Sequence, residues 1–201
     1  MHVVRPPARR ARILALVLSV LAVGASIGFG VFLRRMISLF DRDDPERYAR
    51  PLITALVFLL VALLLRIAAS VCELVWLERT WSNLPAALRK VGPVDNVSSG
   101  LVVGLSFVPG ISWVWKLGLV MAVADGFERV RATRPFRSPV PRNLGMAAVI
   151  VAWVPGLNVY VAPFLWELFA VRLDRVVSEI AQSAAGVQHS APAVVLPWQP
   201  P

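Results

Sequence analysis

The chain has 201 residues, of which 57% are hydrophobic and only 16% are charged, and its formal net charge is +9. This composition excludes an ordinary soluble domain, because the apolar residues fall in long runs. The basic excess does not indicate nucleic-acid binding, since the arginines stand beside apolar runs and no nucleic-acid motif accompanies them. We therefore expect an integral membrane protein whose basic loops contact anionic lipid headgroups.

A basic tail, residues 1–12, precedes the first of four apolar segments. The segments cover 13–33, 51–77, 97–124 and 144–171. Each reaches the roughly 20 residues that a membrane-spanning helix needs. The first runs past a plausible signal cleavage site at Ala25, which favours an uncleaved span over a secretory signal. The predicted fold class is all-α, an integral membrane helical bundle within one domain (13–184), followed by a Pro-rich tail (185–201) that we expect to be disordered.

The polar connectors predict how the second segment begins and ends. Asp44 and Pro45 have the character of a helix cap and a first helical residue, so a short surface helix is expected before that segment. After the segment, Trp76 and Trp81 stand among charges with a helical period. Amphipathic rings favour the headgroup level, so we expect an interfacial continuation of the helix there.

An internal repeat of 46 residues occupies the second half of the chain. Residues 107–130 align without a gap on 153–176, within repeat units of about 93–130 and 139–176. Each copy carries a Pro-Gly pair inside an apolar segment, where a regular helix has to break. The predicted break positions are Pro109, Gly110, Ser112, Pro155, Gly156 and Asn158. The serine and the asparagine could offer oxygens to a ligand, but capping the restarting helix is the preferred interpretation.

Two topologies stay open for these broken segments. If all four segments cross the bilayer, Lys and Arg divide nine against ten between the two sides, and the orientation is undetermined. If each broken segment turns back at its Pro-Gly pair, fourteen basic residues gather on one side and five on the other. That asymmetry is what the positive-inside rule expects. A segment of 28 residues, however, also suffices for one kinked and tilted span.

Four ionisable side chains fall inside the apolar segments. They are Arg66, Glu73, Lys116 and Glu167. An unpaired charge facing lipid costs several kcal/mol, so we expect these side chains to face the bundle and pair with one another. Arg66, Ser70 and Glu73 follow an i, i+4, i+7 spacing and share one face of the second helix. Ion pairs that lock the helices are the preferred explanation, and a polar cluster that binds a ligand or relays protons is the alternative.

Nothing in the sequence indicates catalysis. His2 and His189 both fall in the tails, which argues against a histidine metal site and against histidine general-base chemistry. No phosphate-binding or nucleophile motif occurs. The single cysteine, Cys72, can form no intrachain disulfide. We expect a non-enzymatic protein that needs neither a cofactor nor a metal.

Small residues in the apolar segments allow close helix contact. Gly24 and Gly28 are spaced for it, as are Gly100 and Gly104, either within one chain or in a homo-oligomer. The function expected is therefore helix packing or the binding of a membrane protein partner. A small transporter or channel-type subunit, with the charged cluster at the broken helices, is the alternative.

Two short motifs resemble the signature of a known family. Residues 76–84 read Trp-Leu-Glu-Arg-Thr-Trp-Ser-Asn-Leu, and residues 153–158 read Trp-Val-Pro-Gly-Leu-Asn. Together they resemble an uncharacterised family of bacterial multi-pass membrane proteins with W-L-x-R-x-x-x-N-L and W-(F/V)-x-P-x-x-N-L motifs. The chain departs from that pattern at Ser112, where the family has Asn, and at Pro163, which comes one place late. The resemblance covers about 72–176 and implies a bacterial inner membrane location, without an assigned activity.

Overall fold

The computed structural model of the chain describes residues 5, 7–39, 45–108, 111–154 and 156–190. These residues are helical apart from their connections, and no strand occurs among them. The elements are α1 (Arg9–Leu39), α2 (Pro45–Ser82), the 3-10 helix η1 (Ala86–Leu88), α3 (Ser99–Ser106), α4 (Ile111–Thr133), α5 (Arg142–Val151), α6 (Leu157–Tyr160) and α7 (Ala162–Ser190). The all-α prediction is confirmed for this part of the chain.

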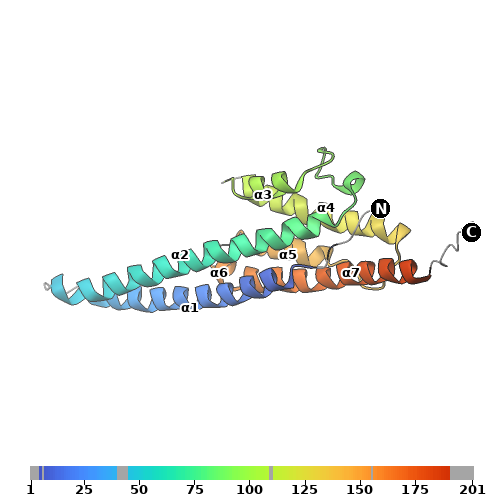
Figure 1. Cartoon of the computed structure of the whole chain (residues 1–201). Helices are drawn as coiled ribbons and strands as arrows, with labels where there is room; N and C mark the ends of the chain where they lie inside the picture. The colour runs from blue at the N-terminus through green and yellow to red at the C-terminus, as the bar shows by residue number, and fades with distance from the viewer. Residues whose placement is uncertain (1–4, 6, 40–44, 109–110, 155, 191–201) are drawn as a thin grey trace, which may run out of the picture.

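The helices α1 and α2 form a long antiparallel pair, and α3 to α7 gather around the end where α1 begins and α2 ends, with α4 and α7 extending beyond that end (Figure 1). Both are long and apolar enough to cross a membrane, and only 17% of the most apolar window of each is buried. Their contact uses alanines at seven-residue intervals, which let the backbones approach. These buried alanines are Ala15 and Ala22 on α1 and Ala55, Ala62 and Ala69 on α2. The large aliphatic side chains of the pair consequently face outward.

One glycine of the predicted close-packing motifs lies in this helix contact. A Cβ on Gly28 would come within 2.7 Å of Phe58 Cδ1, whereas one on Gly24 would meet nothing within 4 Å. The Phe58 ring also stacks on Phe32, with centroids 5.6 Å apart. The motif therefore serves packing between α1 and α2 of the same chain.

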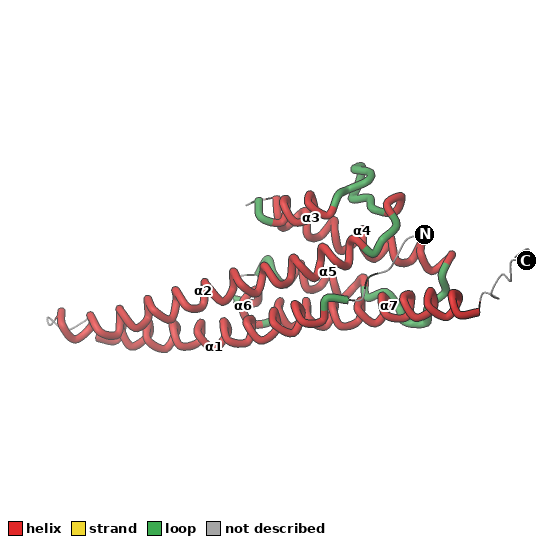
Figure 2. The backbone as a smooth tube through the Cα atoms, in the orientation of Figure 1, coloured by secondary structure: helices red, strands yellow, loops and turns green. Residues whose placement is uncertain are grey.

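Segments 97–124 and 144–171 are each divided into separate helices. The tube in Figure 2 shows the interruptions as loops between helical stretches. In the first segment α4 restarts at Ile111, and in the second α6 restarts at Leu157, which are equivalent positions of the repeat. Pro109, Gly110 and Pro155 themselves lie outside the described residues. The helical interruption nevertheless occurs in both segments.

The residues around the restarts are placed differently from the prediction. Gly156 holds the cap position of α6 with a φ of 84°, a left-handed conformation that glycine adopts at little cost. Asn158 is the second residue of α6, so its predicted capping role is wrong. Ser112 is likewise the second residue of α4. In α6 the N-cap position is held by Gly156, which has no side chain to accept a hydrogen bond from the first turn of the helix.

The second broken segment has one interruption more than the first. Pro163 lies in the first turn of α7, where its missing N–H could not have bonded the carbonyl of Val159. The helix therefore stops at Tyr160 and starts again at Ala162. The equivalent position of the first copy is Leu117, and α4 continues through it without a break.

Both broken segments turn near the middle of α2, and the first starts and finishes beside the C-terminal end of that helix. The carbonyl of Val97, before α3, accepts a hydrogen bond from Trp81, and Gly126 of α4 lies against Leu84. At the other extreme, Phe107 shares a hollow with Arg66, which lies near the middle of the 51–77 run. The second segment turns in the same place, since its restart at α6 hydrogen bonds to Arg66, and Trp166 and Phe169 in its later part pack against Trp76. Each segment is thus a helical hairpin.

The tryptophans after the second segment are core residues. Trp76 and Trp81 are 1% and 0% exposed, so the prediction that their rings lie at an interface is wrong. Trp81 donates its indole N–H to the Val97 carbonyl at 2.9 Å. The rings are buried because the hairpins enclose this end of α2. The residue pattern of α2 alone does not predict that contact. The helix itself does continue past the apolar run, to Ser82.

Helices extend into both of the tails that the sequence predicted. The helix α1 begins at Arg9, inside the tail assigned to 1–12. The helix α7 continues to Ser190, inside the tail assigned to 185–201. Residues 191–201 lie outside the described residues.

The contact of α5 with α4 and α7 requires a glycine at position 145. A Cβ there would lie 2.6 Å from Val120 Cγ1 and 2.8 Å from the Phe169 ring. Gly145→Ala is therefore expected to lower the free energy of unfolding by about 1–3 kcal/mol through overpacking. Thermal unfolding followed by circular dichroism in a mild detergent measures it. Gly104→Ala is the matched control, because an added Cβ meets nothing within 4 Å there; an equal loss in both variants would contradict the packing argument.

Candidate functional site

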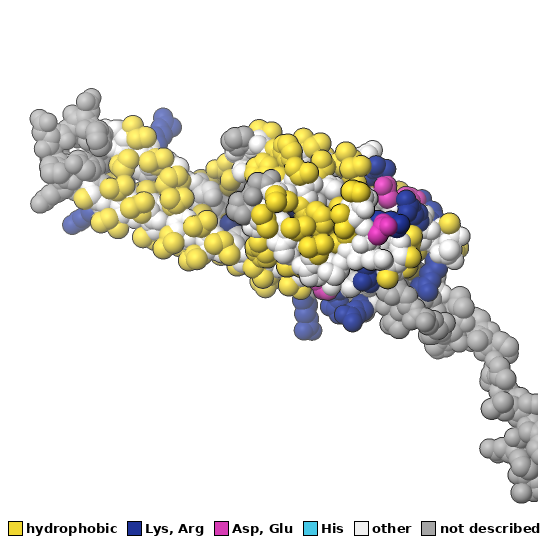
Figure 3. Space-filling model, turned by 90° about the horizontal axis from the view of Figure 1, so that it is seen from above, with side chains coloured by type: hydrophobic (Ala, Val, Ile, Leu, Met, Phe, Trp, Pro, Cys, Tyr) yellow, Lys and Arg dark blue, Asp and Glu magenta, His cyan; other side chains and the backbone are white. Residues whose placement is uncertain are grey.

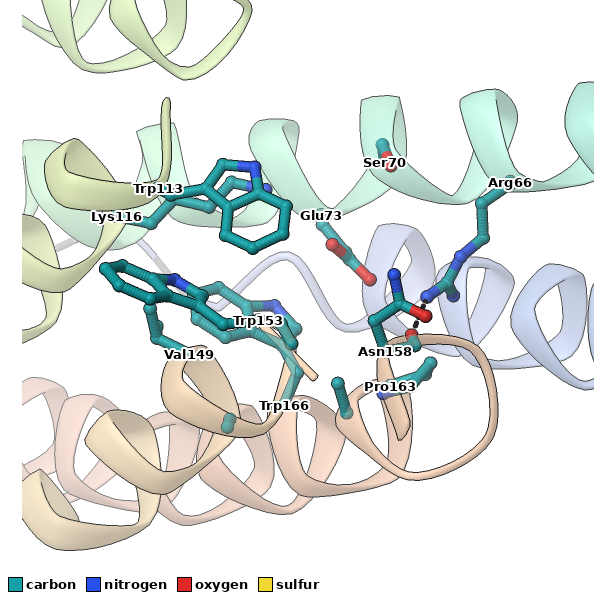
Figure 4. A pocket seen from close by; sticks show the side chains of 13 residues that line it. Arg66, Ser70, Glu73, Trp113, Lys116, Val149, Trp153, Asn158, Pro163 and Trp166 are labelled. Atoms are coloured by element: carbon teal, nitrogen blue, oxygen red, sulfur yellow. Dashed lines mark hydrogen bonds between the residues drawn. The ribbon is translucent and has the colours of Figure 1, made fainter. Parts of the chain in front are cut away.

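A cavity of about 210 Å³ lies between the middle of α2 and the turns of the two hairpins (Figure 4). Its polar lining comes from three helices, α2, α4 and α6. These residues are Arg66, Ser70, Glu73, Lys116 and Asn158, and three tryptophans, Trp113, Trp153 and Trp166, complete the wall. A second hollow of about 290 Å³, beside α3, shares Arg66, Ser70, Glu73, Lys116 and Trp166. The charged side chains thus stand between two hollows.

Three of the four predicted intramembrane charges meet in this cavity. Arg66 donates from Nη2 to the backbone carbonyl of Asn158 at 2.5 Å, which ties α2 to the restart of the second hairpin. Glu73 is placed between Arg66 and Lys116 in the close view (Figure 4). Within the described part of the chain, Glu73 forms no ion pair with either cation. The three charged side chains therefore line one cavity without an ion pair between Glu73 and either cation.

The tryptophans give the cavity an apolar and aromatic side. The rings of Trp113 and Trp153 lie 5.7 Å apart, one from each hairpin. Trp166 packs edge-on against Trp76 at 6.1 Å. The indole nitrogen of Trp166 is buried and has no hydrogen-bond partner among the described residues. An unsatisfied buried N–H costs free energy, so this nitrogen lowers the stability of the cavity wall.

Glu167 belongs to a different cluster. Its Oε1 lies 2.6 Å from Arg12 Nη1, and Arg12 Nε lies 2.9 Å from Asp174 Oδ2. Trp76 donates to Asp174 Oδ1 at 2.9 Å, and both side chains are almost completely buried. Burial raises the pKa of the Asp174 carboxyl, and the Trp76 hydrogen bond and the Arg12 charge offset this only in part. This network joins α1, α2 and α7 near the base of the second hairpin.

The partners of Glu167 differ from those predicted. Arg12 was assigned to the basic tail, and Asp174 lies beyond the fourth apolar segment. A usable signal was present, because Glu167 and Asp174 are seven residues apart and share one face of a helix. The four-charge cluster is therefore divided in the structure: Arg66, Glu73 and Lys116 share a cavity, and Glu167 pairs with Arg12.

The first of the two family-like motifs has a structural role in this chain. Trp76, Leu77, Asn83 and Leu84 are each at most 4% exposed. Asn83 donates to the Arg5 carbonyl at 3.0 Å and accepts from the Arg5 N–H at 2.8 Å. These contacts fasten the chain before α1 to the end of α2, close to the hairpin bases.

Neither metal chemistry nor a known relative identifies the site. In the described ranges, no group of three or more His, Cys, Asp or Glu side chains is placed to hold a metal ion. No family model, no curated protein and no solved structure matches the chain. The function of the chain is therefore inferred from the geometry of the cavity.

Proposed function

We propose that this chain is a non-enzymatic, multi-pass protein of a bacterial cytoplasmic membrane that binds a small polar ligand in the cavity beside α2, as a small transporter or channel-type subunit. One observation carries the proposal. Arg66, Glu73 and Lys116 converge on one cavity without closing into ion pairs. Charges that only locked helices together would pair directly, because an unpaired buried charge is costly. Water or a ligand between them removes that cost.

The distribution of side chains supports a membrane setting. Hydrophobic side chains cover the middle of the face in Figure 3, and charged side chains gather mainly at one end, with a few basic ones at the other. A helix in the core of a soluble protein would bury most of its apolar window. The low burial of α1 and α2 instead favours contact with lipid.

The lengths of the hairpin arms support re-entry rather than crossing. The arms α3 and α5 have 8 and 10 residues. At 1.5 Å per residue they reach about 12 and 15 Å, roughly half of a 30 Å hydrocarbon core. In this topology loops 78–96 and 125–143 share a side, where their arginines meet anionic headgroups.

A role in helix packing or partner binding is the second candidate. It is favoured by the network of Arg12, Glu167, Asp174 and Trp76, which joins α1, α2 and α7 without needing a ligand. The two candidates differ in one respect that an experiment can reach. Only a ligand site requires water to enter the cavity beside Ser70.

Cysteine labelling at position 70 tests the proposed cavity. In a Cys72→Ala background, Ser70→Cys is expected to react with a small, membrane-impermeant methanethiosulfonate reagent, because the reactive thiolate forms where water is present. Val71→Cys is the matched control, since Val71 is the next residue of α2 and is 46% exposed on the apolar surface. Labelling of purified protein in nanodiscs, followed by mass spectrometry, gives the two rates. Protection of both cysteines would refute a water-filled cavity.

A further inference from the structure

The groups in the cavity differ in what they offer to an occupant. Lys116 presents an ammonium with three donors and forms no ion pair or hydrogen bond among the described residues. Ser70 and Asn158 contribute neutral groups that can donate and accept, and the carboxylate of Glu73 is the charged acceptor of the lining. The two charged donors, Arg66 and Lys116, therefore outnumber the charged acceptor at this site.

The charges that line the cavity favour an anionic occupant. Arg66 and Lys116 contribute two positive charges and Glu73 one negative charge, which leaves the lining net positive. Glu167, an acid that interacts electrostatically with Glu73, is already paired with Arg12. A cationic occupant would meet Glu73 but would be repelled by two fixed cations. An anion restores neutrality, which the low dielectric of a membrane interior strongly favours.

The walls beside the donors are aromatic. Trp113 and Trp153 pack together at the rim and are 44% and 47% exposed, so their rings extend from the cavity to the apolar surface. The volume of about 210 Å³ equals that of roughly seven waters, which suits a small organic ion rather than a large molecule. An apolar body next to the rings and an acidic group next to Lys116 would satisfy both parts of the lining.

We infer, on the basis of the proposed function, that the ligand is a small monocarboxylate whose carboxylate binds Lys116 and whose apolar body lies against Trp113 and Trp153. The same chemistry occurs in water-soluble aromatic acids and in short fatty acids from the bilayer. Benzoate represents the first source and octanoate the second. The rim of exposed tryptophan is compatible with entry from either.

Calorimetric titration of the full chain in nanodiscs, with empty nanodiscs subtracted, tests this inference. Benzoate or octanoate is expected to bind, and benzamide, a neutral isostere of benzoate, at least about tenfold more weakly, because charge-assisted hydrogen bonds are lost. Lys116→Gln should weaken carboxylate binding by a similar factor, and Lys116→Arg should retain most of it. Lys90→Gln is the matched control, since Lys90 is an exposed residue paired with Asp95.

The outcomes test the identity of the ligand separately from the existence of the cavity. Preference for benzoate or for octanoate assigns the source, and both support the inference. Equal binding of benzamide, or tighter binding of benzyltrimethylammonium, overturns it. Failure of both carboxylates to bind a chain whose Ser70→Cys variant is labelled also overturns it, while leaving the proposed cavity intact. Retained helical content and a single size-exclusion peak exclude misfolding of Lys116→Gln as the cause.

Discussion

Asp174→Ala is expected to lower the free energy of unfolding by about 3–5 kcal/mol, the cost of breaking a buried ion pair from one side. The substitution removes the acceptor of the Trp76 indole N–H and the anion beside Arg12. Arg12 and Asp174 have side chains only 15% and 6% exposed, so water cannot replace the lost partners. The midpoint of thermal unfolding in a mild detergent should fall by roughly 10 °C.

The matched control is Asp125→Ala. Asp125 also pairs with an arginine, Arg142, at 3.1 Å, but the two side chains are 49% and 46% exposed. Exposed pairs contribute at most about 1 kcal/mol, so this variant should change the midpoint little. Asp174→Asn should lie between the two, because it keeps an oxygen for Trp76 and loses the charge. Equal effects at positions 174 and 125 would show that the buried network does not stabilise the hairpin base.

A double-mutant cycle separates the ion pair from the rest of the network. Arg12 Nε and Asp174 Oδ2 lie 2.9 Å apart, yet neither atom has a hydrogen-bond partner, so their contact is an electrostatic one. If the two groups stabilise each other, Arg12→Ala should cost much less in the Asp174→Ala background than in the native chain. Additive costs would assign the stability to Trp76 and Glu167 instead.

The features that the sequence predicted correctly depend on short-range patterns. An apolar run longer than a bilayer is thick predicted α1 and α2 as membrane-length helices, and both occur. The proline and glycine pairs predicted interruptions, and helices are interrupted in both segments. The spacing of Arg66, Ser70 and Glu73 predicted one polar face, and all three line one cavity. Each of these depends on a pattern within one continuous stretch of the chain.

The features that were missed depend on which helices become neighbours. Trp76 and Trp81 have the character of interfacial residues on an isolated helix and become core residues only because the hairpins cover them. Glu167 finds Arg12 across 155 positions of the chain, a pairing that no local period contains. The unpartnered Trp166 nitrogen has no sequence signature at all. The resemblance to a bacterial membrane family stays a prediction.

Labelling from the two sides of the membrane is expected to place loop 125–143 with residues 78–96 and apart from residues 34–50. In a Cys72→Ala background, Ala132→Cys, Ala87→Cys and Ser38→Cys each introduce one exposed thiol, in the order of those three regions. The positive-inside rule puts the fourteen basic residues of the first two regions and the termini inside. An impermeant maleimide on intact cells should therefore label only Ser38→Cys.

The strength of this experiment is that the two topologies differ at a single position. Residues 38 and 87 flank α2, which crosses in both, so they lie on opposite sides and serve as internal controls. Position 132 follows the first broken segment; if that segment crossed once, Ala132→Cys would label together with Ser38→Cys. The structure gives the physical reason to expect otherwise, since Gly126 lies against Leu84, just before position 87, and Phe107 lies beside Arg66 in mid-helix. A chain that returns to the end of α2 where it began has entered and left on one side, so both repeat copies would point the same way and present their breaks to the same cavity.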